Sequence, residues 1–305
     1  MTTNAPVVAM DIGGTHIRAA LVAADGTILD QHRQRAELSH LTGNVAAAVM
    51  DALTAAAAPL LPLAKAVGIG FPGFISDGVV AGAPNIPQME GVALQALLCQ
   101  RMQRPVRLDN DAACAALGEW RFGAGRGAAS LLHLTLGTGI GGGLVHDGRI
   151  FGGDCGMAFE FGHLRINSAT DARRCGCGNR GCVETYASAT AVGTRYSEAA
   201  GGEARDAAEV NRLAQQGDVL AQQVWHQAGS ALGVAIAQAI KLLDVRTVTI
   251  SGGMIAAWHQ FQPAMMAAID THVIAPQRGR IQVLPSTLED CAGLLGAAAL
   301  VMKLP

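Results

Sequence analysis

The sequence has few aromatic residues, few charged residues and no long apolar run. Aromatic side chains make up 4% of the 305 residues and charged side chains 15%, and the formal net charge is −2. The longest apolar stretch, AGLLGAAALVM near the C-terminus, is too short to span a bilayer, so we expect no membrane segment. Lys and Arg form no run longer than Arg173-Arg174. Because binding to a phosphate backbone needs a basic face, we expect no nucleic-acid partner.

A secretion signal and a disulfide framework are also missing. The N-terminal MTTNAPVVAMD has no basic segment followed by an apolar one, so no signal peptide is expected. Seven cysteines, an odd number, do not indicate paired disulfides, and three of them lie close to a histidine. We therefore expect a cytoplasmic protein with a metal site. Half of the residues are hydrophobic, which is enough for a large core.

Strand and helix patterns alternate along the chain, and one unit of the pattern occurs twice. A strand over 7–12 enters a glycine turn, and two strands follow around Asp25-Gly26. A strand over 131–136 enters GTGIGGG and leads into LVHDGRI, which repeats this plan. The alternation indicates an α/β protein, and the repeat predicts two related domains. Further strands are expected at 17–22, 27–31, 66–71, 106–109, 247–251 and 281–284, and helices at 44–58, 91–103, 111–120, 205–243 and 292–303.

The segment over 163–182, HLRINSATDARRCGCGNRGC, carries one histidine and three cysteines. Thiolate and imidazole are the ligands that zinc prefers, and four of them make a closed structural site. The segment therefore predicts a zinc site formed by His163, Cys175, Cys177 and Cys182. Glu160 and Glu184 flank this segment, and their carboxylates are suitable acceptors for sugar hydroxyls.

Two glycine loops each follow a predicted strand. DIGGT over 11–15 and LGTGIGGG over 136–143 present backbone N–H groups that can approach phosphate oxygens closely. Asp11 is a candidate ligand for Mg²⁺. Neither loop is a P-loop, and a hairpin follows the second where a dinucleotide-binding unit needs a helix. Two such loops suit a nucleoside triphosphate, although DIGGT alone is equally consistent with a plain tight turn.

Two further motifs hold polar side chains at strand ends and turns. In DNDAA over 109–113, Asp111 either caps the following helix or takes a proton from an attacking hydroxyl. In APNIP over 83–87, Asn85 either faces a hydroxyl-rich ligand or forms an ordinary Asx turn. His133 and His226 lie on apolar elements, and we expect them to be packed there.

Together these motifs resemble those of the ROK family of sugar kinases, within the actin-like, Hsp70-like ATPase superfamily. The resemblance runs in order through DIGGTHIR, GIGFPGFISDG, APNIPQMEG, DNDAACAALGE, LTLGTGIGGGLV, EFGH, CGCGNRGCVE and SGGM. The pairing of EFGH with CxCGxxGCxE is its most specific part. The resemblance implies a two-lobed α/β fold of the actin-like (ribonuclease H-like) type with duplicated mixed sheets. It implies a small lobe over 1–110 plus 292–305, and a large lobe over 111–291 that contains the zinc segment.

The resemblance also implies an ATP-dependent kinase that acts on a hexose, usually at the C6 hydroxyl, with Asp111 as general base. Glucose is the first expectation, and N-acetylmannosamine, N-acetylglucosamine, fructose and allose are alternatives. The implied sugar-binding residues are Gly73, Asn85, Asn110, Asp111, Glu160, His163 and Glu184. The residues implied for phosphates, Mg²⁺ and nucleoside are Asp11, Gly13, Gly14, Thr15, Gly137, Thr138, Gly139, Gly252 and Gly253. Family members are often homodimers, so the same is expected here.

Two positions depart from the family pattern. Phe159 stands where the family usually has glycine, and Ala113 where many members have asparagine. We expect these residues to affect the choice of sugar, and not the base or the zinc ligands. Sugar-responsive repressors are a competing class, but they carry a DNA-binding extension, and only ten residues precede Asp11. A non-catalytic, zinc-stabilised binding module is a third reading, and Asp111 together with both glycine loops argues against it.

Overall fold

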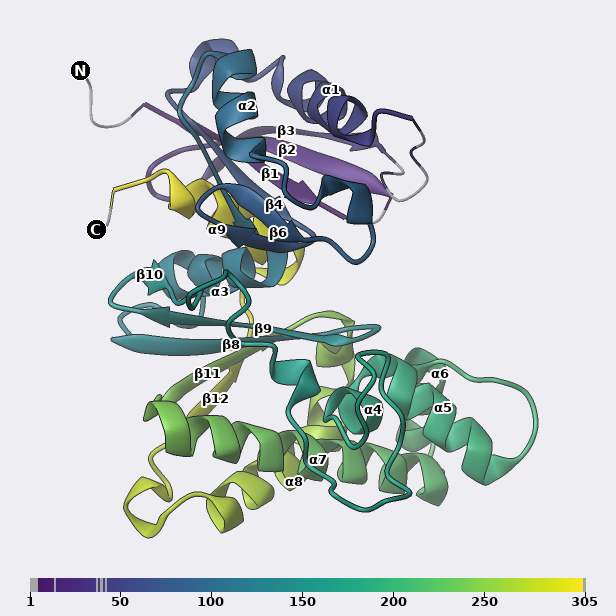
Figure 1. The fold of residues 1–305 in the computed structure, drawn as a ribbon. Helices are drawn as coiled ribbons and strands as arrows, with labels where there is room; N and C mark the ends of the chain where they lie inside the picture. Colours follow the sequence, from purple (N-terminus) through teal and green to yellow (C-terminus); the bar gives the residue numbers. More distant parts are fainter. Residues whose placement is uncertain (1–4, 14, 37, 39–40, 42, 304–305) are drawn as a thin grey trace. The chain divides into compact units, whose positions relative to one another are not determined.

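The computed structural model describes residues 5–303, apart from 14, 37, 39–40 and 42. The chain packs into two compact units, and strands and helices alternate in both (Figure 1). The first unit comprises 1–129, 143–159 and 287–305, and the second comprises 130–142 and 160–286.

A mixed five-stranded sheet forms the centre of the first unit. Its order is β3-β2-β1-β4-β7, with β1 antiparallel to β2 and parallel to β4. The strands are β1 (Val7–Ile12), β2 (His16–Val22), β3 (Ile28–Arg35), β4 (Val67–Phe71) and β7 (Val106–Asn110), with a separate hairpin of β5 (Phe74–Ser76) and β6 (Val79–Gly82). The α-helices of this unit are α1 (Val45–Ala57), α2 (Leu94–Met102), α3 (Asp111–Phe122) and α9 (Ala292–Leu300).

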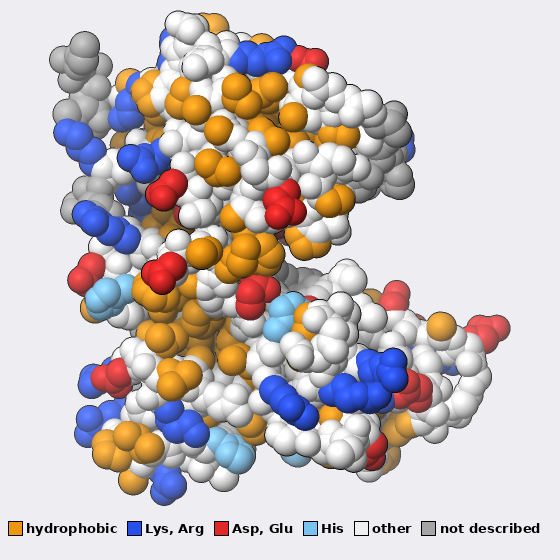
Figure 2. Space-filling view, viewed as in Figure 1, with side chains coloured by type: hydrophobic (Ala, Val, Ile, Leu, Met, Phe, Trp, Pro, Cys, Tyr) orange, Lys and Arg blue, Asp and Glu red, His pale blue; other side chains and the backbone are white. Residues whose placement is uncertain are grey.

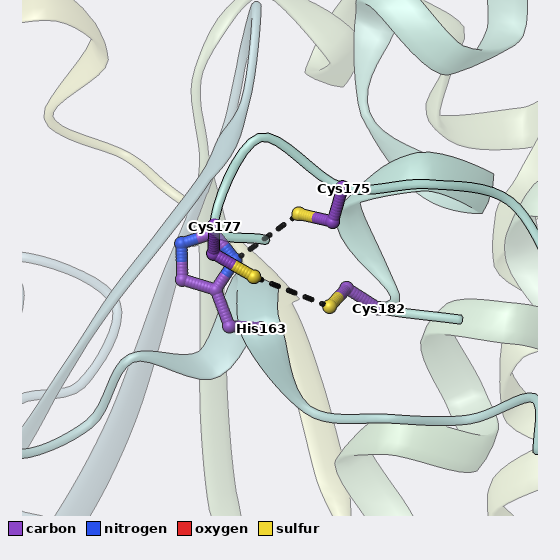
Figure 3. A group of neighbouring side chains, drawn as sticks. All are labelled: His163, Cys175, Cys177 and Cys182. Atoms are coloured by element: carbon purple, nitrogen blue, oxygen red, sulfur yellow. Dashed lines mark hydrogen bonds between the residues drawn. The ribbon is translucent and has the colours of Figure 1, made fainter. Parts of the chain in front are cut away.

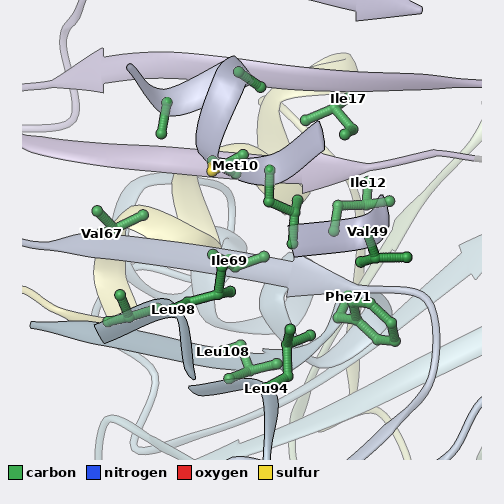
Figure 4. Close-up of a cluster of buried hydrophobic side chains, with 14 of the residues drawn as sticks. Met10, Ile12, Ile17, Val49, Val67, Ile69, Phe71, Leu94, Leu98 and Leu108 are labelled. Atoms are coloured by element: carbon green, nitrogen blue, oxygen red, sulfur yellow. The ribbon is translucent and has the colours of Figure 1, made fainter. Parts of the chain in front are cut away.

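Side chains of β1 alternate between the two faces of the sheet, and both faces are buried at this strand, whereas the edge strand β3 is largely exposed. Met10 and Ile12 point into a core shared with α1 and α2, which Figure 4 shows together with Val49 of α1 and Leu94 of α2. Val7 and Ala9 point to the other face, where apolar side chains of α9 cover them. Helices thus cover the sheet on both sides of β1. This packing fixes the positions at which β1 and β7 end.

Helices α3 and α9 approach each other closely enough that their backbones touch. A Cβ atom placed on Gly118 would lie 2.2 Å from the carbonyl oxygen of Ala292. One placed on Gly296 would lie 1.6 Å from the carbonyl oxygen of Cys114. Only glycine permits this crossing, which fixes α3 and therefore its first residue, Asp111.

A second five-stranded sheet has the order β10-β9-β8-β11-β12, which repeats the order of the first. Strand β11 runs parallel to both β8 and β12. These strands are β8 (Ser130–Leu136), β9 (Ile140–His146), β10 (Arg149–Ile150), β11 (Thr247–Ser251) and β12 (Gln282–Pro285). The remaining α-helices are α4 (Glu184–Ala187), α5 (Ala189–Ala200), α6 (Ala207–Gln215), α7 (Val219–Leu243) and α8 (Trp258–His272). Short 3-10 helices cover Leu61–Leu63, Pro87–Met89, Phe161–His163, Gly253–Ala257, Ala275–Gln277 and Glu289–Cys291.

The expected duplicated α/β fold is confirmed, and each predicted strand and helix has a counterpart within a few residues. The helical stretch predicted over 205–243 is two helices, α6 and α7, separated at Gly217. Helices α4, α5 and α8 and the β5–β6 hairpin were not predicted. The units also differ from the expected lobes, because α3 and residues 143–159 belong to the first unit.

The distribution of charged side chains and the character of the helices both agree with the composition. Basic and acidic side chains are interspersed on the face shown in Figure 2, as a net charge near zero implies. Among the described residues, no helix combines the length and the apolar character that crossing a membrane requires.

Candidate functional site

Asp111 is the first residue of α3 and directly follows strand β7. The cap of this helix is Asn110, whose Oδ1 accepts a hydrogen bond of 3.0 Å from the backbone N–H of Ala113. The carboxylate of Asp111 is therefore not needed as the cap, and its Oδ1 accepts only locally, 2.8 Å from the N–H of Ala112. Capping of α3 therefore does not account for Asp111, and its carboxylate is available for another role.

The electrostatic setting of Asp111 suits a base. Burial raises the pKa of Asp111 to about 6, and the charge of nearby Asp11 contributes to the rise. A carboxyl group with this pKa is mostly ionised at pH 7, yet it holds a proton more strongly than an exposed aspartate. Tuning of this kind brings the pKa of a general base close to the working pH.

Asn110 also links strand β7 to the segment after β4. Its Nδ2 donates to the carbonyl oxygen of Gly73 at 3.2 Å, so two predicted sugar-binding residues are brought together. Asn85 lies in an exposed turn after β6. The structure thus places Asn110 and Gly73 beside Asp111 in the same unit.

The first glycine loop follows β1 and begins with Asp11. Arg18 on β2 donates to Oδ2 of Asp11 from both Nε, at 3.2 Å, and Nη2. The other oxygen, Oδ1, faces Gly293 at the start of α9. Gly13 donates from its backbone N–H to the carbonyl oxygen of His16, and Thr15 is exposed, while Gly14 lies outside the described residues.

A neighbouring carboxyl group, Asp109, provides a control for the pH dependence of any reaction at Asp111. Burial raises the pKa of Asp109 to about 6 as well. Because a base must be deprotonated, we expect kcat/KM to fall about tenfold per pH unit below pH 6. The acid limb should persist in Asp109→Asn, as measured in rate profiles between pH 4.5 and about 8. If Asp109→Asn abolished the limb, the titrating group would not be Asp111.

The second unit holds a compact cluster of metal-ligand side chains. The donor atoms of His163, Cys175, Cys177 and Cys182 all lie within 4.8 Å of one another (Figure 3). The sulfurs of Cys177 and Cys182 are 3.7 Å apart, and the sulfur of Cys175 is 3.5 Å from Nδ1 of His163. In a tetrahedral zinc site, two sulfurs lie about 3.8 Å apart, and sulfur and nitrogen about 3.5 Å apart. These two distances match those of such a site, and the remaining donor pairs lie within 4.8 Å.

The surroundings of the cluster act on its thiols and on its histidine. Burial raises the pKa of the Cys182 thiol to about 12, whereas the N–H of Asn179 lowers the pKa of Cys177. A bound divalent metal would displace these thiol protons. The second ring nitrogen of His163, Nε2, lies 3.7 Å from the carboxylate of Glu160. A carboxylate behind a ligating histidine fixes its orientation in many metal sites.

Glu184 connects the metal cluster to the second glycine loop. Its Oε2 accepts a hydrogen bond of 2.9 Å from the backbone N–H of Ile140, at the end of that loop. Its Oε1 lies 4.0 Å from the sulfur of Cys175. Burial raises the pKa of Glu160, and the charge of Glu184 contributes to the rise, so the two carboxylates are close enough to interact.

The second glycine loop is held against the start of helix α5. The N–H of Ala189 donates to the carbonyl oxygen of Gly137, and Oγ1 of Thr190 donates to that of Thr138, each at 2.8 Å. The N-terminus of a helix attracts anions, so this loop lies where a phosphate group is favoured. A hollow of about 500 Å³ adjoins it, lined by Thr138, Ala189, Thr190, Gly193, Thr194, Ser197, Glu198, Ala204, Arg205, Asp206 and Ala207.

Gly252 and Gly253 follow β11 in the second unit. Gly252 has a φ of +92°, and a Cβ atom there would lie 2.3 Å from the carbonyl oxygen of Leu136. Gly253 has open space around it. The structure therefore brings the 252–253 turn directly against the second glycine loop.

Phe159, the position that departs from the family pattern, has a φ of +73°. This left-handed backbone is ordinary for glycine and strained for a bulky residue. We therefore expect Phe159→Gly to be more stable than Phe159→Ala by about 1 kcal/mol, since both lack the ring and only alanine keeps the strain. Urea unfolding of the two variants measures the difference. Equal stabilities would mean that the backbone at residue 159 is not strained.

Several residues of these sites gave no sequence signal of their own. Arg18, the partner of Asp11, lies in a strand pattern, and Asp109 ends the strand predicted over 106–109. Thr190 lines the hollow beside Thr138 and belongs to α5, a helix that was not predicted, while Arg205, at the start of the helix predicted over 205–243, precedes α6. The N-cap Ser188, which precedes α5, is the signal that marks this helix start.

Comparison with known proteins gives one consistent result. A sequence profile described as the ROK family matches residues 7–304. The chain is 33% identical to a glucokinase of Thermotoga maritima, over 97% of both chains. It is also 33% identical to an N-acetylmannosamine kinase of Escherichia coli, over 96% of this chain and 97% of the relative. Among solved structures, a ROK family glucokinase from Streptomyces griseus in complex with glucose and AMPPNP superposes with a TM-score of 0.76, at 32% identity and over 97% of this chain and 98% of that one.

Proposed function

The chain belongs to the ROK family, and on this premise we propose that it is an ATP-dependent hexose kinase. The reaction transfers the γ-phosphoryl group of ATP to a sugar hydroxyl, which we propose is the one on C6. The observation that carries this proposal is the setting of Asp111. Its carboxylate is not needed to cap α3, because Asn110 is the cap, and burial raises its pKa to about 6. Similarity over nearly the whole length to a glucokinase and an N-acetylmannosamine kinase supports it.

In the proposed reaction, Asp111 accepts the proton of the sugar hydroxyl as its oxygen attacks the γ-phosphorus of ATP. The bond from that phosphorus to the β,γ-bridging oxygen breaks, and ADP leaves. Phosphoryl transfer needs mainly positioning and charge stabilisation from the protein. Backbone N–H groups of both glycine loops and the start of α5 would supply the latter.

We assign nucleotide binding to the two glycine loops and their neighbours. Gly137, Thr138 and Gly139 would meet the phosphates, with Gly252 and Gly253 near the nucleoside and the hollow beside Thr138 large enough for it. Asp11, Gly13, Gly14 and Thr15 would complete the phosphate contacts. Mg²⁺ would be held at Asp11, a carboxylate that suits this ion, and would neutralise phosphate charge.

We propose that the sugar is bound by Gly73, Asn85, Asn110, Asp111, Glu160, His163 and Glu184. We propose that the cluster of His163, Cys175, Cys177 and Cys182 binds structural Zn²⁺, because its donor set and distances match a tetrahedral site. By holding His163, this ion would fix the orientation of a sugar-binding side chain. Cytoplasmic location and a homodimer are further proposals, the second by family analogy only.

A sugar panel tests the proposed function. Sugar-dependent ADP release is measured with glucose, N-acetylmannosamine, N-acetylglucosamine, fructose and allose, and kcat/KM is compared. We expect turnover of at least one, with glucose the most efficient. No turnover of any hexose, with AMPPNP still bound, would contradict a kinase and favour a sugar- or nucleotide-binding protein.

A further inference from the structure

A buried polar cluster lies between strands β8 and β11. The ring of His133 is fully buried, and its Nδ1 lies 2.9 Å from Oγ1 of Thr249, while its Nε2 lies 2.9 Å from Oγ of Ser251. Thr135 completes the cluster, with its Oγ1 3.3 Å from Oγ of Ser251. Packed apolar side chains would fill such a position without any need for partners, so this set of four requires an explanation.

The strand register places all four side chains on one face of the sheet. His133 is paired with Thr249, and Thr135 with Ser251, in the parallel ladder. The ring contacts with Thr249 and Ser251 therefore join β8 to β11 beyond the backbone ladder itself, whereas Oγ1 of Thr135, 3.4 Å from Nε2, lies on β8 like the ring. Val248, which neighbours Thr249 in β11, points to the opposite face and is also fully buried.

The cluster lies directly behind two loops. Thr135 is followed by Leu136 and the glycine loop over 137–139, and Ser251 is followed by Gly252 and Gly253. The starts of the two loops are in contact, because a Cβ atom on Gly252 would meet the carbonyl oxygen of Leu136, the residue before Gly137, at 2.3 Å. A shift of one strand against the other would therefore move one loop relative to the other.

We infer that His133 is a positioning residue for the nucleotide, which sets the relative position of the two glycine loops through Thr249 and Ser251. This inference rests on the proposed kinase function only for the identity of the ligand. The ring acts in its neutral form, with one nitrogen donating and the other accepting. In agreement, burial lowers the pKa of His133 to about 3, so the ring stays neutral over the working pH range.

The test compares variants of the full-length protein. His133→Leu removes both hydrogen bonds, His133→Gln keeps an amide that can donate and accept, and Thr249→Val removes one bond at constant volume. Val248→Ala is the matched control, because it weakens the core on the opposite face of the same strand. Each variant is characterised by its melting temperature, its Kd for AMPPNP, and its KM for ATP and for the sugar.

For His133→Leu we expect a Kd for AMPPNP and a KM for ATP at least about fivefold higher, because small misplacements of binding groups are costly. The KM for the sugar should stay within about twofold. Thr249→Val should weaken AMPPNP binding less, and His133→Gln should restore part of it. Val248→Ala should lower only the melting temperature.

The inference is overturned if His133→Leu and Thr249→Val bind AMPPNP as the wild type does, or if Val248→Ala weakens it equally. Should His133→Leu fail to fold, Thr249→Val and His133→Gln decide the question. AMPPNP binding separates the inference from the proposed function. A wild type that binds AMPPNP but phosphorylates no sugar would refute only the kinase, and one that binds no AMPPNP would refute both.

Discussion

Substituting Asp111 by asparagine is expected to lower kcat for sugar phosphorylation at least about 100-fold, the usual contribution of a general base. Asparagine keeps the size of the side chain but cannot accept the proton of the hydroxyl. Since Asn110 caps helix α3, the helix start does not depend on the carboxylate. The Kd for AMPPNP should therefore stay within about threefold of the wild type.

The stability of Asp111→Asn shows whether a loss of activity comes from the missing base or from a damaged fold. The folded-state pKa of Asp111 is raised to about 6, so the native protein binds this proton more tightly than the unfolded chain. Stability from this group is present at acid pH and is lost as pH rises through about 6. At pH 7, Asp111→Asn should consequently be as stable as the wild type or more so, by on the order of 1–2 kcal/mol after allowance for partial exposure.

Asp109→Asn is the matched control for this variant. Asp109 is two residues away, has the same raised pKa and, like Asp111, accepts from the N–H of the residue that follows it, but it lies within strand β7 and is not among the proposed sugar-binding residues. We expect its kcat to stay within about tenfold of the wild type. Near-normal turnover by Asp111→Asn, or an equal loss in Asp109→Asn, would remove Asp111 from the role of base.

The second large effect is expected at the metal cluster. Cys177→Ser should lose bound zinc, lower the melting temperature by at least about 5 °C and lower kcat/KM at least about tenfold. The stability effect follows because four ligands close a segment of twenty residues that has little regular structure. The activity effect follows because His163 is a ligand and Glu184 lies beside Cys175 while holding the N–H of Ile140.

Cys155→Ser is the control for this substitution. Cys155 is an exposed cysteine outside the cluster, so its variant should keep zinc, stability and activity. Metal content is measured by atomic emission after dialysis, and stability by thermal unfolding. A wild type without zinc, or Cys177→Ser with full zinc content, would contradict the metal site.

The sequence predicted best what depends on local patterns. Strands β1 and β8 are apolar runs that end in glycine loops, and their repetition revealed the duplicated fold. The four metal ligands lie within twenty residues, so their spacing alone indicated a site that the structure brings together. In both cases the information is contained in a few consecutive residues.

What the sequence missed depends on packing between distant segments. Helix α5 contains Gly193, which reads as a helix breaker, yet a Cβ there would lie 2.3 Å from the carbonyl oxygen of Arg205. Helix α8 contains Pro263, a residue that is unfavourable inside a helix, and this helix was not predicted either. His133 was expected to be merely packed, because its partners, Thr249 and Ser251, lie more than a hundred residues away in the chain. Likewise, no local pattern reveals that Glu184 holds Ile140.

The most direct test of the central claim is to identify the product of the wild-type protein with glucose, ATP and Mg²⁺. Phosphorus NMR of the reaction mixture distinguishes a phosphate on C6 from one on another hydroxyl and follows ADP at the same time. We predict stoichiometric formation of ADP and glucose 6-phosphate, and neither product in Asp111→Asn on the same time scale. ADP formed equally with and without any hexose of the panel, or no ADP at all, would contradict a hexose kinase.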